Sequence, residues 1–237
     1  MAGRLVIPLA QLKQATARLA AVGAPPTPVL RSKWIDAAIG CACHFKAEHL
    51  QRTGSFKYRG ATNAVGALDS ATVGKGVVAH SSGNHGAAIA AAAAARGIPC
   101  TVVVPRTTPE AKVANMRRYG AQVVMCEPTQ AARTAASAAE AERMGGAAFI
   151  HPYDDEMVIA GQGTIGIELL EQVPEVRQLR MERTPSESLL TVLMRAASHT
   201  PHLSPHAKLT SPRWEARTHT GDVPHLCYGS WMRWWCP

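Results

Sequence analysis

The sequence predicts an α/β fold in which parallel strands are flanked by helices, and two observations carry this prediction. Short runs rich in Val, Ile and Ala alternate along the chain with helix-like segments of about a dozen residues. Their apolar residues follow one another continuously rather than at every second position, which is typical of strands covered by helices on both faces of a sheet. A chain of 237 residues is long enough to bury such a core as one large or two small domains.

Before this alternation begins, the chain mixes helical and extended signals. Apolar residues at helical spacing predict a helix over residues 8–21, and the Pro-rich APPTPVL at 24–30 predicts an extended connector. CHFKAE at 43–48 alternates as a strand does. We expect a helix over 55–68, with the hydroxyl of Ser55 as its N-cap.

Strands and helices then alternate regularly along the middle of the chain. The expected strands are 76–80, 100–105, 121–127 and 147–152, and the expected helices are 86–96, 109–119, 130–144 and 156–173. The last of these helices begins with a glycine-rich stretch, which we interpret as an interruption. Because each strand is followed by a helix long enough to cross back over the sheet, the strands should run parallel.

After Pro174 the character of the chain changes. Four of the five tryptophans and five of the ten histidines follow it, and prolines recur too often for a strand or a long helix beyond about Ala197. Only ESLLTVLMRAA at 187–197 carries a helical signal. We therefore expect residues 176–237 to form an irregular tail.

Composition argues against several classes of function. The net charge of +8 comes from scattered Lys and Arg residues rather than from a basic run, which argues against a nucleic-acid partner. No apolar stretch is long enough for a membrane span, and the N-terminus does not read as a secretion signal. These features predict a cytoplasmic protein with reduced thiols and with neither a nucleic-acid nor a membrane partner.

Cysteine and histidine form no recognisable metal site in the sequence. The six cysteines are Cys41, Cys43, Cys100, Cys126, Cys227 and Cys236. Their spacing matches no zinc or disulfide pattern. His199, His202 and His206 could join the last two cysteines, but intervening prolines and the lack of paired spacing argue against a metal. We predict no metal ligands.

Two glycine-bearing loops stand where α/β proteins build binding sites, beyond a strand and at the start of a helix. QRTGSFKYRG at 51–60 contains Lys57, and HSSGNHG at 80–86 follows a strand. In the second loop, Gly83 and Gly86 let the backbone approach a ligand, and the N–H groups of the following helix favour a carboxylate or phosphate. The alternative is a capped helix start that binds nothing, as most Ser/Asn-rich turns are.

Five motifs together resemble the fold-type-II pyridoxal-phosphate (PLP) enzymes, which have a tryptophan synthase β-like fold, and within them the serine racemase and serine/threonine dehydratase group. They are EHLQRTGSFKYRGA (48–61), SSGNHG (81–86), VVVP (102–105), YGAQVVMCEP (119–128) and HPYDDEMVIAGQGTIGIE (151–168). The resemblance implies a large PLP-binding domain from residues 1–76 and 155–175, which would be incomplete, and a small α/β domain over 77–154. Residues 176–237 would be a tail unrelated to the family.

The resemblance assigns roles to residues of both loops. Lys57 would form the Schiff base with PLP and remove the α-proton of the substrate, with Phe56 shielding the amine from water. Asn84 would hydrogen-bond the ring hydroxyl of PLP, and Tyr153 would also lie against the cofactor. The substrate carboxylate would be held by Ser81, Ser82, Asn84 and His85.

Ser82 separates two activities within the group. The resemblance places serine here in serine racemases and alanine in threonine dehydratases, and a hydroxyl could protonate the substrate on the face opposite Lys57. This favours racemisation of serine, a small amino acid, accompanied by elimination of water to pyruvate and ammonia. Tyr153 favours the alternative, an L-serine/threonine dehydratase, because an aromatic residue is familiar there in dehydratases.

The resemblance also implies further ligands and a homodimer. The family binds a divalent cation and ATP, and the residues that lie where eukaryotic serine racemases contact the nucleotide are Ser32, Arg52, Thr53 and Tyr119. The carboxylates of the cation site cannot be found in this chain. Nor can the glycine-rich loop that cradles the cofactor phosphate, since no glycine occurs between Gly166 and Gly221. A catalytically inactive, truncated isoform is therefore a third hypothesis.

Overall fold

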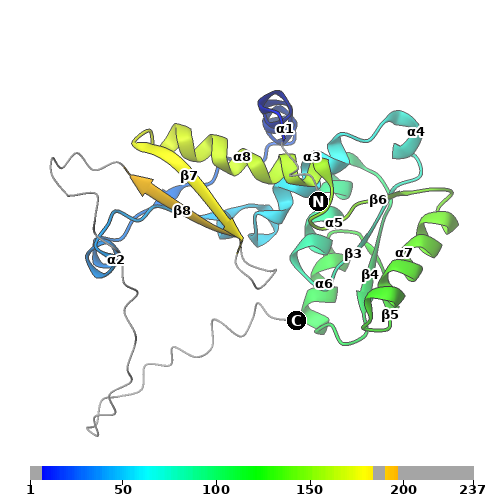
Figure 1. Ribbon diagram of the computed structural model, residues 1–237. Helices are drawn as coiled ribbons and strands as arrows, with labels where there is room; N and C mark the ends of the chain where they lie inside the picture. The colour runs from blue at the N-terminus through cyan, green and yellow to red at the C-terminus, as the bar shows by residue number, and fades with distance from the viewer. Residues whose placement is uncertain (1–6, 184–189, 197–237) are drawn as a thin grey trace, which may run out of the picture. The chain divides into compact units, whose positions relative to one another are not determined.

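The computed structural model describes residues 7–183 and 190–196, and contacts divide the chain into two units, Met1–Pro174 and Glu175–Pro237 (Figure 1). The helices of the first unit are α1 (Leu9–Ala21), α2 (Lys33–Ile39), α3 (Lys57–Gly66), α4 (Ser70–Val73), α5 (Asn84–Arg96), α6 (Glu110–Arg118), α7 (Gln130–Arg143) and α8 (Glu156–Gln172). Its strands are β1 (Val29–Leu30), β2 (Phe45–Lys46), β3 (Val77–His80), β4 (Cys100–Pro105), β5 (Gln122–Cys126) and β6 (Ala148–Phe149). Two 3-10 helices, η1 (Glu48–Leu50) and η2 (Arg52–Gly54), precede α3.

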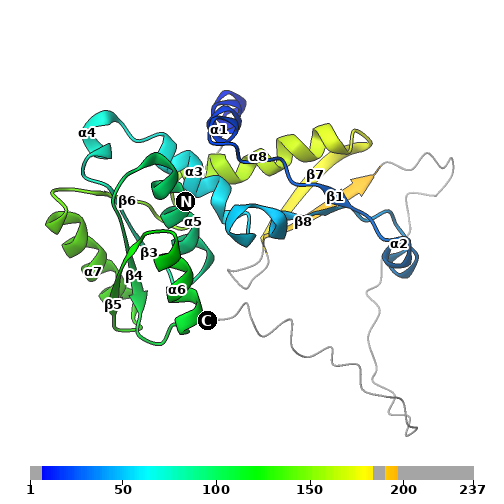
Figure 2. The same cartoon turned by 180° about the vertical axis from the view of Figure 1, so that it is seen from behind.

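A four-stranded parallel sheet forms the core of the first unit, in the order β5-β4-β3-β6. Every residue of β3 and β4 is buried, as the uniformly apolar runs predict. Helix α7 covers one face of this sheet, while α5 and α6 lie on the other (Figure 1, Figure 2). The predicted α/β class, with parallel strands flanked by helices, is confirmed.

Helices α1, α3 and α8 pack together, and α3 also packs against α5. Glycines let α3 and α8 cross at close range. A Cβ on Gly161 would lie 2.6 Å from the backbone oxygen of Arg59, and a Cβ on Gly60 would lie 2.7 Å from the backbone oxygen of Val158. The glycine-rich stretch therefore serves helix packing, and α8 is continuous rather than interrupted as we expected.

The regular part of the sequence prediction is confirmed, and the differences are local. All expected strands and helices between residues 76 and 173 are present, with ends that differ by a few residues. The expected N-cap is wrong, because Phe56 takes that position and the buried Ser55 hydroxyl has no hydrogen-bond partner within the described parts of the chain. The boundaries of a large and a small domain within the first unit stay a prediction.

Helix α2 is missing from the sequence prediction, which placed no element between the connector at 24–30 and residue 43. Its N-cap is Ser32, whose hydroxyl accepts a hydrogen bond from the backbone N–H of Ile35 at 3.5 Å, and Gly40 ends it in the left-handed conformation at φ 81°. Seven residues are too few for a periodic pattern, so only these end signals could have revealed it.

The described part of the second unit is an antiparallel pair, β7 (Val176–Arg183) and β8 (Leu190–Ala196). The helix expected over 187–197 is therefore wrong for residues 190–196, and the expected irregular tail begins instead with two strands. Thr191 and Val192 are β-branched, which favours an extended strand once β7 is there to pair with it. The remainder of the expected tail lies outside the described residues.

Candidate functional site

The candidate site lies at the carboxyl ends of β3 and β6, where parallel α/β sheets bind their ligands. From β3 the chain passes through residues 81–83 into α5 and continues to β4. Strand β4 pairs with one edge of β3, and β6 pairs with the other edge. Such a reversal of strand order is the place where open α/β sheets bind their ligands. Lys57, at the start of α3, and residues 150–153, which follow β6, meet there.

Lys57 is a partly buried amine with no acidic partner. Its Nζ donates a hydrogen bond to the backbone oxygen of Pro152 at 2.9 Å and lies 5.2 Å from the centre of the Phe56 ring. Within the described residues no carboxylate forms an ion pair with it. Burial therefore lowers the pKa of Lys57 without a compensating negative charge, which increases the fraction of the nucleophilic, deprotonated amine.

The 81–84 loop is held by its own polar groups and presents others to solvent. The backbone N–H of Ser81 donates to the oxygen of Val103 at 3.0 Å, and the Ser81 hydroxyl accepts from the N–H of Gly83 at 3.1 Å. Ser82 and Asn84 are exposed. The loop thus carries a free hydroxyl and an amide at the N-terminus of α5, where backbone N–H groups favour an anion.

Lys112 of α6 adds a cation beside this loop, which the sequence analysis did not identify. Its Nζ lies 3.9 Å from the position that a Cβ on Gly83 would occupy. Nothing in the local sequence marks Lys112, because α6 is a polar surface helix that carries two further arginines. The packing of α6 against α5 brings the ammonium group to the loop and strengthens its preference for negative charge.

His85 connects the loop to Lys57. Its side chain is buried, and its Nε2 lies 3.2 Å from the backbone oxygen of Ile150, so that Nε2 carries the proton in the neutral ring. Burial chiefly, then the positive charges of Lys57, His80 and His151, lower the pKa of His85 to about 3 although the Ile150 hydrogen bond opposes the shift. His85 and Lys57 thus contact the same segment after β6, at the backbone oxygens of Ile150 and Pro152, and their grouping into one binding site stays a prediction.

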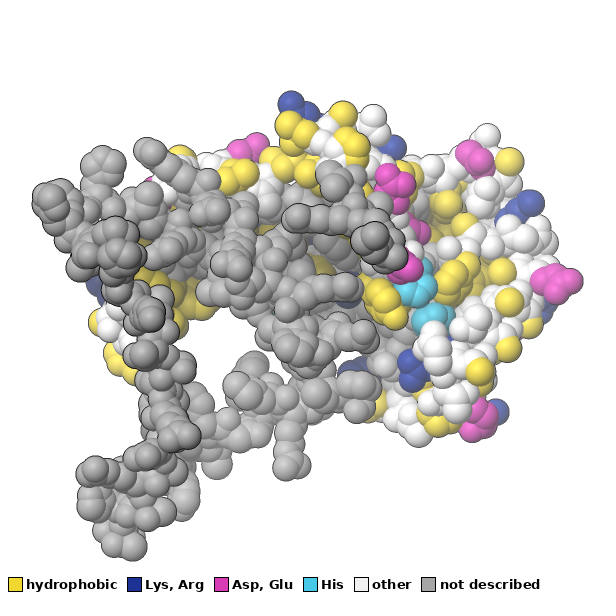
Figure 3. Space-filling view, in the orientation of Figure 1, with side chains coloured by type: hydrophobic (Ala, Val, Ile, Leu, Met, Phe, Trp, Pro, Cys, Tyr) yellow, Lys and Arg dark blue, Asp and Glu magenta, His cyan; other side chains and the backbone are white. Residues whose placement is uncertain are grey.

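Aromatic rings line the edge of the sheet next to the loop. The ring of His80 lies 5.3 Å from that of Phe149 and 5.9 Å from that of His151, which in turn lies 4.5 Å from the ring of Tyr153. Burial first, and then the charges of His151 and Arg133, lower the pKa of His80. Figure 3 shows histidine side chains at the surface over this part of the sheet, among hydrophobic ones.

Tyr153 itself is 66% exposed, so its ring is available to a ligand as well as to His151. The backbone N–H groups of Tyr153 and Asp154 both donate to Nδ1 of His151, at 3.4 and 2.9 Å. His151 therefore fixes the turn that carries Tyr153. Its assigned contact with the cofactor stays a prediction.

The predicted nucleotide residues have separate local roles. Ser32 caps α2, and Tyr119 lies under the guanidinium of Arg118 at 5.5 Å. Arg52 donates to the hydroxyl of Tyr58 at 3.3 Å, while Thr53 has the left-handed φ of 71° that is unusual for a β-branched residue. No hydrogen bond or ring contact between described residues joins the four predicted side chains. Nucleotide binding stays a prediction.

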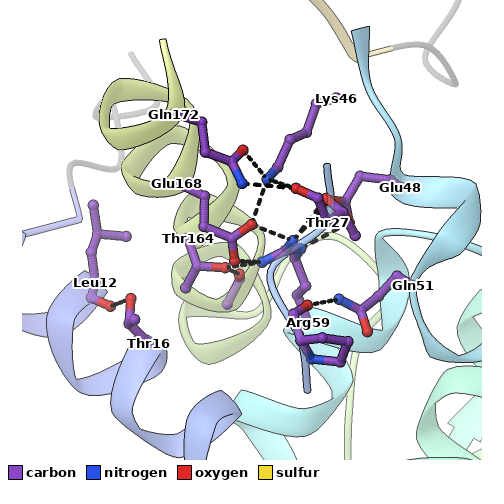
Figure 4. A network of polar contacts seen from close by, with 12 residues as sticks. Leu12, Thr16, Thr27, Lys46, Glu48, Gln51, Arg59, Thr164, Glu168 and Gln172 are labelled. Carbon is purple, nitrogen blue, oxygen red and sulfur yellow. Dashed lines mark hydrogen bonds and ion pairs between the residues drawn. The ribbon is translucent and has the colours of Figure 1, made fainter. Parts of the chain in front are cut away.

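The sequence analysis missed a buried polar cluster behind Lys57, although its motif was quoted (Figure 4). The Arg59 guanidinium is fully buried and is bonded to both Glu48 and Glu168, and Lys46 contacts Glu168 from β2 at 2.6 Å. Burial alone would lower the pKa of Arg59, but the hydrogen bonds that it donates to the two carboxylates outweigh burial and raise that pKa. The sequence offered one signal for this cluster. Arg59 is a long, charged side chain in a helix made mostly of small residues, and such a side chain needs acidic partners when it is buried.

Two searches of the described residues were negative. No group of three or more His, Cys, Asp or Glu side chains there could hold a metal ion, and Cys41, Cys43, Cys100 and Cys126 are free thiols. Within the same part of the chain no helix combines the length and the apolar character required to cross a membrane.

Comparison with known proteins gives one family. A family model described as "pyridoxal-phosphate dependent enzyme" matches residues 21–180, so the similarity extends a few residues into β7, beyond the limit that we expected. A β-hydroxyaspartate dehydratase of Paracoccus denitrificans is 50% identical over 147 residues, which are 62% of this chain and 46% of the relative. A serine racemase of Oryza sativa is 45% identical over 165 residues, which are 70% of this chain and 48% of the relative.

A solved structure agrees with these relatives. The structure of maize serine racemase matches with a TM-score of 0.70 and 44% sequence identity, covering 73% of this chain and 52% of that chain. The chain spans about half the length of the curated relatives it matches.

Proposed function

Because this chain belongs to the family of pyridoxal-phosphate-dependent enzymes, we propose that it acts at Cα of serine, racemising it and eliminating water to give pyruvate and ammonia. One observation carries the proposal. The Lys57 amine is partly buried, has no acidic partner among the described residues, and binds the backbone oxygen of Pro152, two residues from the Ile150 oxygen that contacts His85 at the start of α5. The serine racemases among the relatives support this choice of substrate.

The residues present fit the reactive side of PLP. Lys57 offers the amine that can bond to the aldehyde, Phe56 lies beside that amine, and Asn84 is exposed at the start of α5. For the phosphate the chain offers less, since the family's glycine-rich loop has no counterpart after α8. When bound, PLP supplies an electron sink for the negative charge that develops at Cα.

Residues of the chain would perform the proton transfers and bind the substrate. The N–H groups at the start of α5, with Lys112 nearby, would hold the substrate carboxylate. Lys57 Nζ would take the proton from Cα on one face, and the exposed Ser82 hydroxyl would return a proton on the other. The buried His85 would stay neutral and help to exclude water from Lys57.

A second candidate is dehydration of β-hydroxyaspartate, the substrate in the name of the Paracoccus relative. The Lys112 ammonium beside the loop favours a substrate with an additional carboxylate. Within the serine group, an L-serine/threonine dehydratase is a further alternative, which Tyr153 favours.

The third candidate is an inactive chain that does not retain the cofactor, because the described residues contain no glycine-rich loop after α8 that would hold its phosphate. Colour separates this candidate from the others. Protein that binds PLP through Lys57 turns yellow and Lys57→Ala stays colourless, whereas colourless wild-type protein after incubation with PLP would support the inactive chain.

Product analysis then tests which reaction occurs. Protein incubated with PLP and L-serine should yield D-serine by chiral chromatography and pyruvate in a coupled assay, and parallel reactions with L-threonine and β-hydroxyaspartate define the substrate. Pyruvate without D-serine would favour the dehydratase. Neither product from yellow protein with any of these substrates would contradict the proposal.

Ser82→Ala tests the second proton donor. Loss of the hydroxyl should lower racemisation about 10²–10⁴-fold and leave elimination less affected. Ser81→Ala is the matched control, because the Ser81 hydroxyl already accepts from Gly83 within the loop. Equal loss of both reactions in Ser82→Ala would remove this role from Ser82.

A further inference from the structure

We propose that Arg59 is a positioning residue for Lys57, and that the buried cluster around it fixes the first turn of α3 so that the Lys57 amine stays out of water. Only the catalytic role of Lys57 is taken from the proposed function. The positioning itself concerns the chain's own residues and can be tested without the cofactor.

The helix geometry places the two cations back to back. Lys57 is the first residue of α3 and Arg59 the third, and two helical steps turn the side-chain direction by roughly 200°. Lys57 therefore points toward Pro152 at the sheet edge, while Arg59 points toward α8 and η1. Any rotation or shift of this turn moves both side chains together.

The guanidinium is held by two carboxylates on its opposite sides. Its Nε and Nη2 donate to the two oxygens of Glu48, both at 2.8 Å, and Nη1 and Nη2 donate to those of Glu168 at 2.5 and 2.9 Å. Bidentate contacts of this kind fix the plane of the guanidinium as well as its position. Nη1 also donates to the hydroxyl of Thr164 at 3.1 Å.

Other segments of the chain close the cluster. Lys46 Nζ donates to the backbone oxygen of Thr27 at 2.6 Å and to the side-chain oxygen of Gln172 at 2.7 Å, in addition to Glu168 (Figure 4). The connector before β1, strand β2, η1, α3 and α8 are thus tied at one point. Two ammonium or guanidinium cations face two carboxylates, so the cluster has no net charge.

A buried ion-pair cluster contributes little to stability compared with well-packed apolar residues, and its best-attested use is to fix one arrangement of the chain. Here the arrangement that it fixes includes the reacting amine. The pKa of Lys57 is lowered by burial alone, so it depends on how well the start of α3 keeps water away. His85 is the titratable group that interacts with Lys57, and Arg59, Glu48 and Glu168 lie on the other side of the helix turn.

The test is the pKa of Lys57 in the whole chain without PLP. Trace labelling with acetic anhydride over a pH series, followed by peptide mass spectrometry, reports the pKa of each lysine, with the exposed Lys13 as internal reference. Arg59→Met and Glu168→Gln should both raise the pKa of Lys57 toward its ordinary value of about 10.4, because both loosen the turn. Arg59→Lys, which keeps the charge but loses the bidentate contacts, should raise it less.

Glu168→Gln separates positioning from simple charge. Removal of that carboxylate leaves an excess of positive charge behind α3, which by electrostatics alone would lower the pKa of Lys57 further. An upward shift supports positioning, and a downward shift or none contradicts it. If the charged-residue variants do not fold, Thr164→Val removes one neutral hydrogen bond from Arg59, and an unchanged pKa of Lys57 in that variant would overturn the proposal.

Two matched controls exclude a general effect of instability. Val103→Ala creates a cavity in β4, on the sheet face opposite to Val102 and Val104, and should lower stability while leaving the pKa of Lys57 unchanged. Arg117→Met breaks an exposed ion pair with Glu110 and should change neither quantity. A shift in Val103→Ala as large as that in Arg59→Met would assign the effect to lost stability and overturn the proposal. Attachment of PLP to Lys57 is tested separately by colour, so the proposed function and the positioning role of Arg59 can each fail without the other.

Discussion

The first turn of α3 carries two cations, Lys57 and Arg59, whose pKa values shift in opposite directions. Lys57 is partly buried against Pro152 and Phe56 with no carboxylate beside it, and its pKa is lowered. Arg59 is fully buried between Glu48 and Glu168, and its pKa is raised. Burial acts on both groups, so the difference comes from the partners. An unpaired amine becomes reactive, and a paired guanidinium becomes part of the framework.

The largest expected effect comes from removing the paired cation. Arg59→Met leaves two partly buried carboxylates, of which only Glu168 keeps a cation, Lys46, and should lower the free energy of unfolding by about 3–5 kcal/mol. Lys57→Met removes an unpaired, desolvated charge and should leave that free energy unchanged or raise it. Urea denaturation followed by circular dichroism measures both. Equal destabilisation by the two variants would remove the contrast between the two cations.

The next effect tests how tightly α8 holds α3 beside the cluster. A methyl group on Gly161 would meet the backbone of Arg59 and Gly60, so Gly161→Ala should cost about 3 kcal/mol, the upper end for overpacking. Gly74→Ala is the control, because nothing lies within 4 Å of its Cβ position and its φ of −64° suits alanine. Similar melting temperatures for the two variants would show that the crossing of α3 and α8 can relax.

A smaller effect extends the comparison to His85, a buried titratable group that, like Lys57, has no acidic partner among the described residues. Its pKa is about 3 in the folded chain against an ordinary 6.5, so the unfolded chain takes up the proton first as the pH falls. Stability from this group is present above pH 6.5 and is lost as the pH falls toward 3. Each pH unit below the ordinary pKa lowers the free energy of unfolding by about 1.4 kcal/mol. Between pH 7 and pH 5 the loss should therefore be about 2 kcal/mol.

Denaturation at both pH values, for wild type and His85→Gln, measures this contribution. The variant should lose less stability than wild type across the same interval. Parallel losses in the two proteins would mean that His85 protonates without cost and is not buried as described.

The smallest effect is expected at the surface. Arg117 and Glu110 form an ion pair in which both side chains are more than half exposed, at 53% and 72%. Arg117→Met should change the free energy of unfolding by less than about 0.5 kcal/mol. A loss comparable with that of Arg59→Met would show that burial does not distinguish the two arginines.

Much of the fold and the position of Lys57 could be predicted from the sequence. The role of Arg59 could not, because it depends on contacts between distant residues. The strands, the helices and the two glycine-bearing loops follow from local periodicity and from turn residues, and Lys57 follows from its motif. The role of Arg59 does not, because one of its partners, Glu168, is 109 residues away and comes near only when α8 crosses α3. The strand at Leu190–Ala196 was mistaken for a helix for a similar reason, since its pairing with β7 outweighs a helical pattern.

The attachment of PLP to Lys57 is the central claim, and one measurement tests it most directly. The protein is incubated with PLP and treated with borohydride, which makes an imine linkage permanent, and its peptides are mapped by mass spectrometry. The account predicts a single modified residue, Lys57, and no stable modification in Lys57→Ala. A mass increase on another lysine instead, or on none, would contradict it.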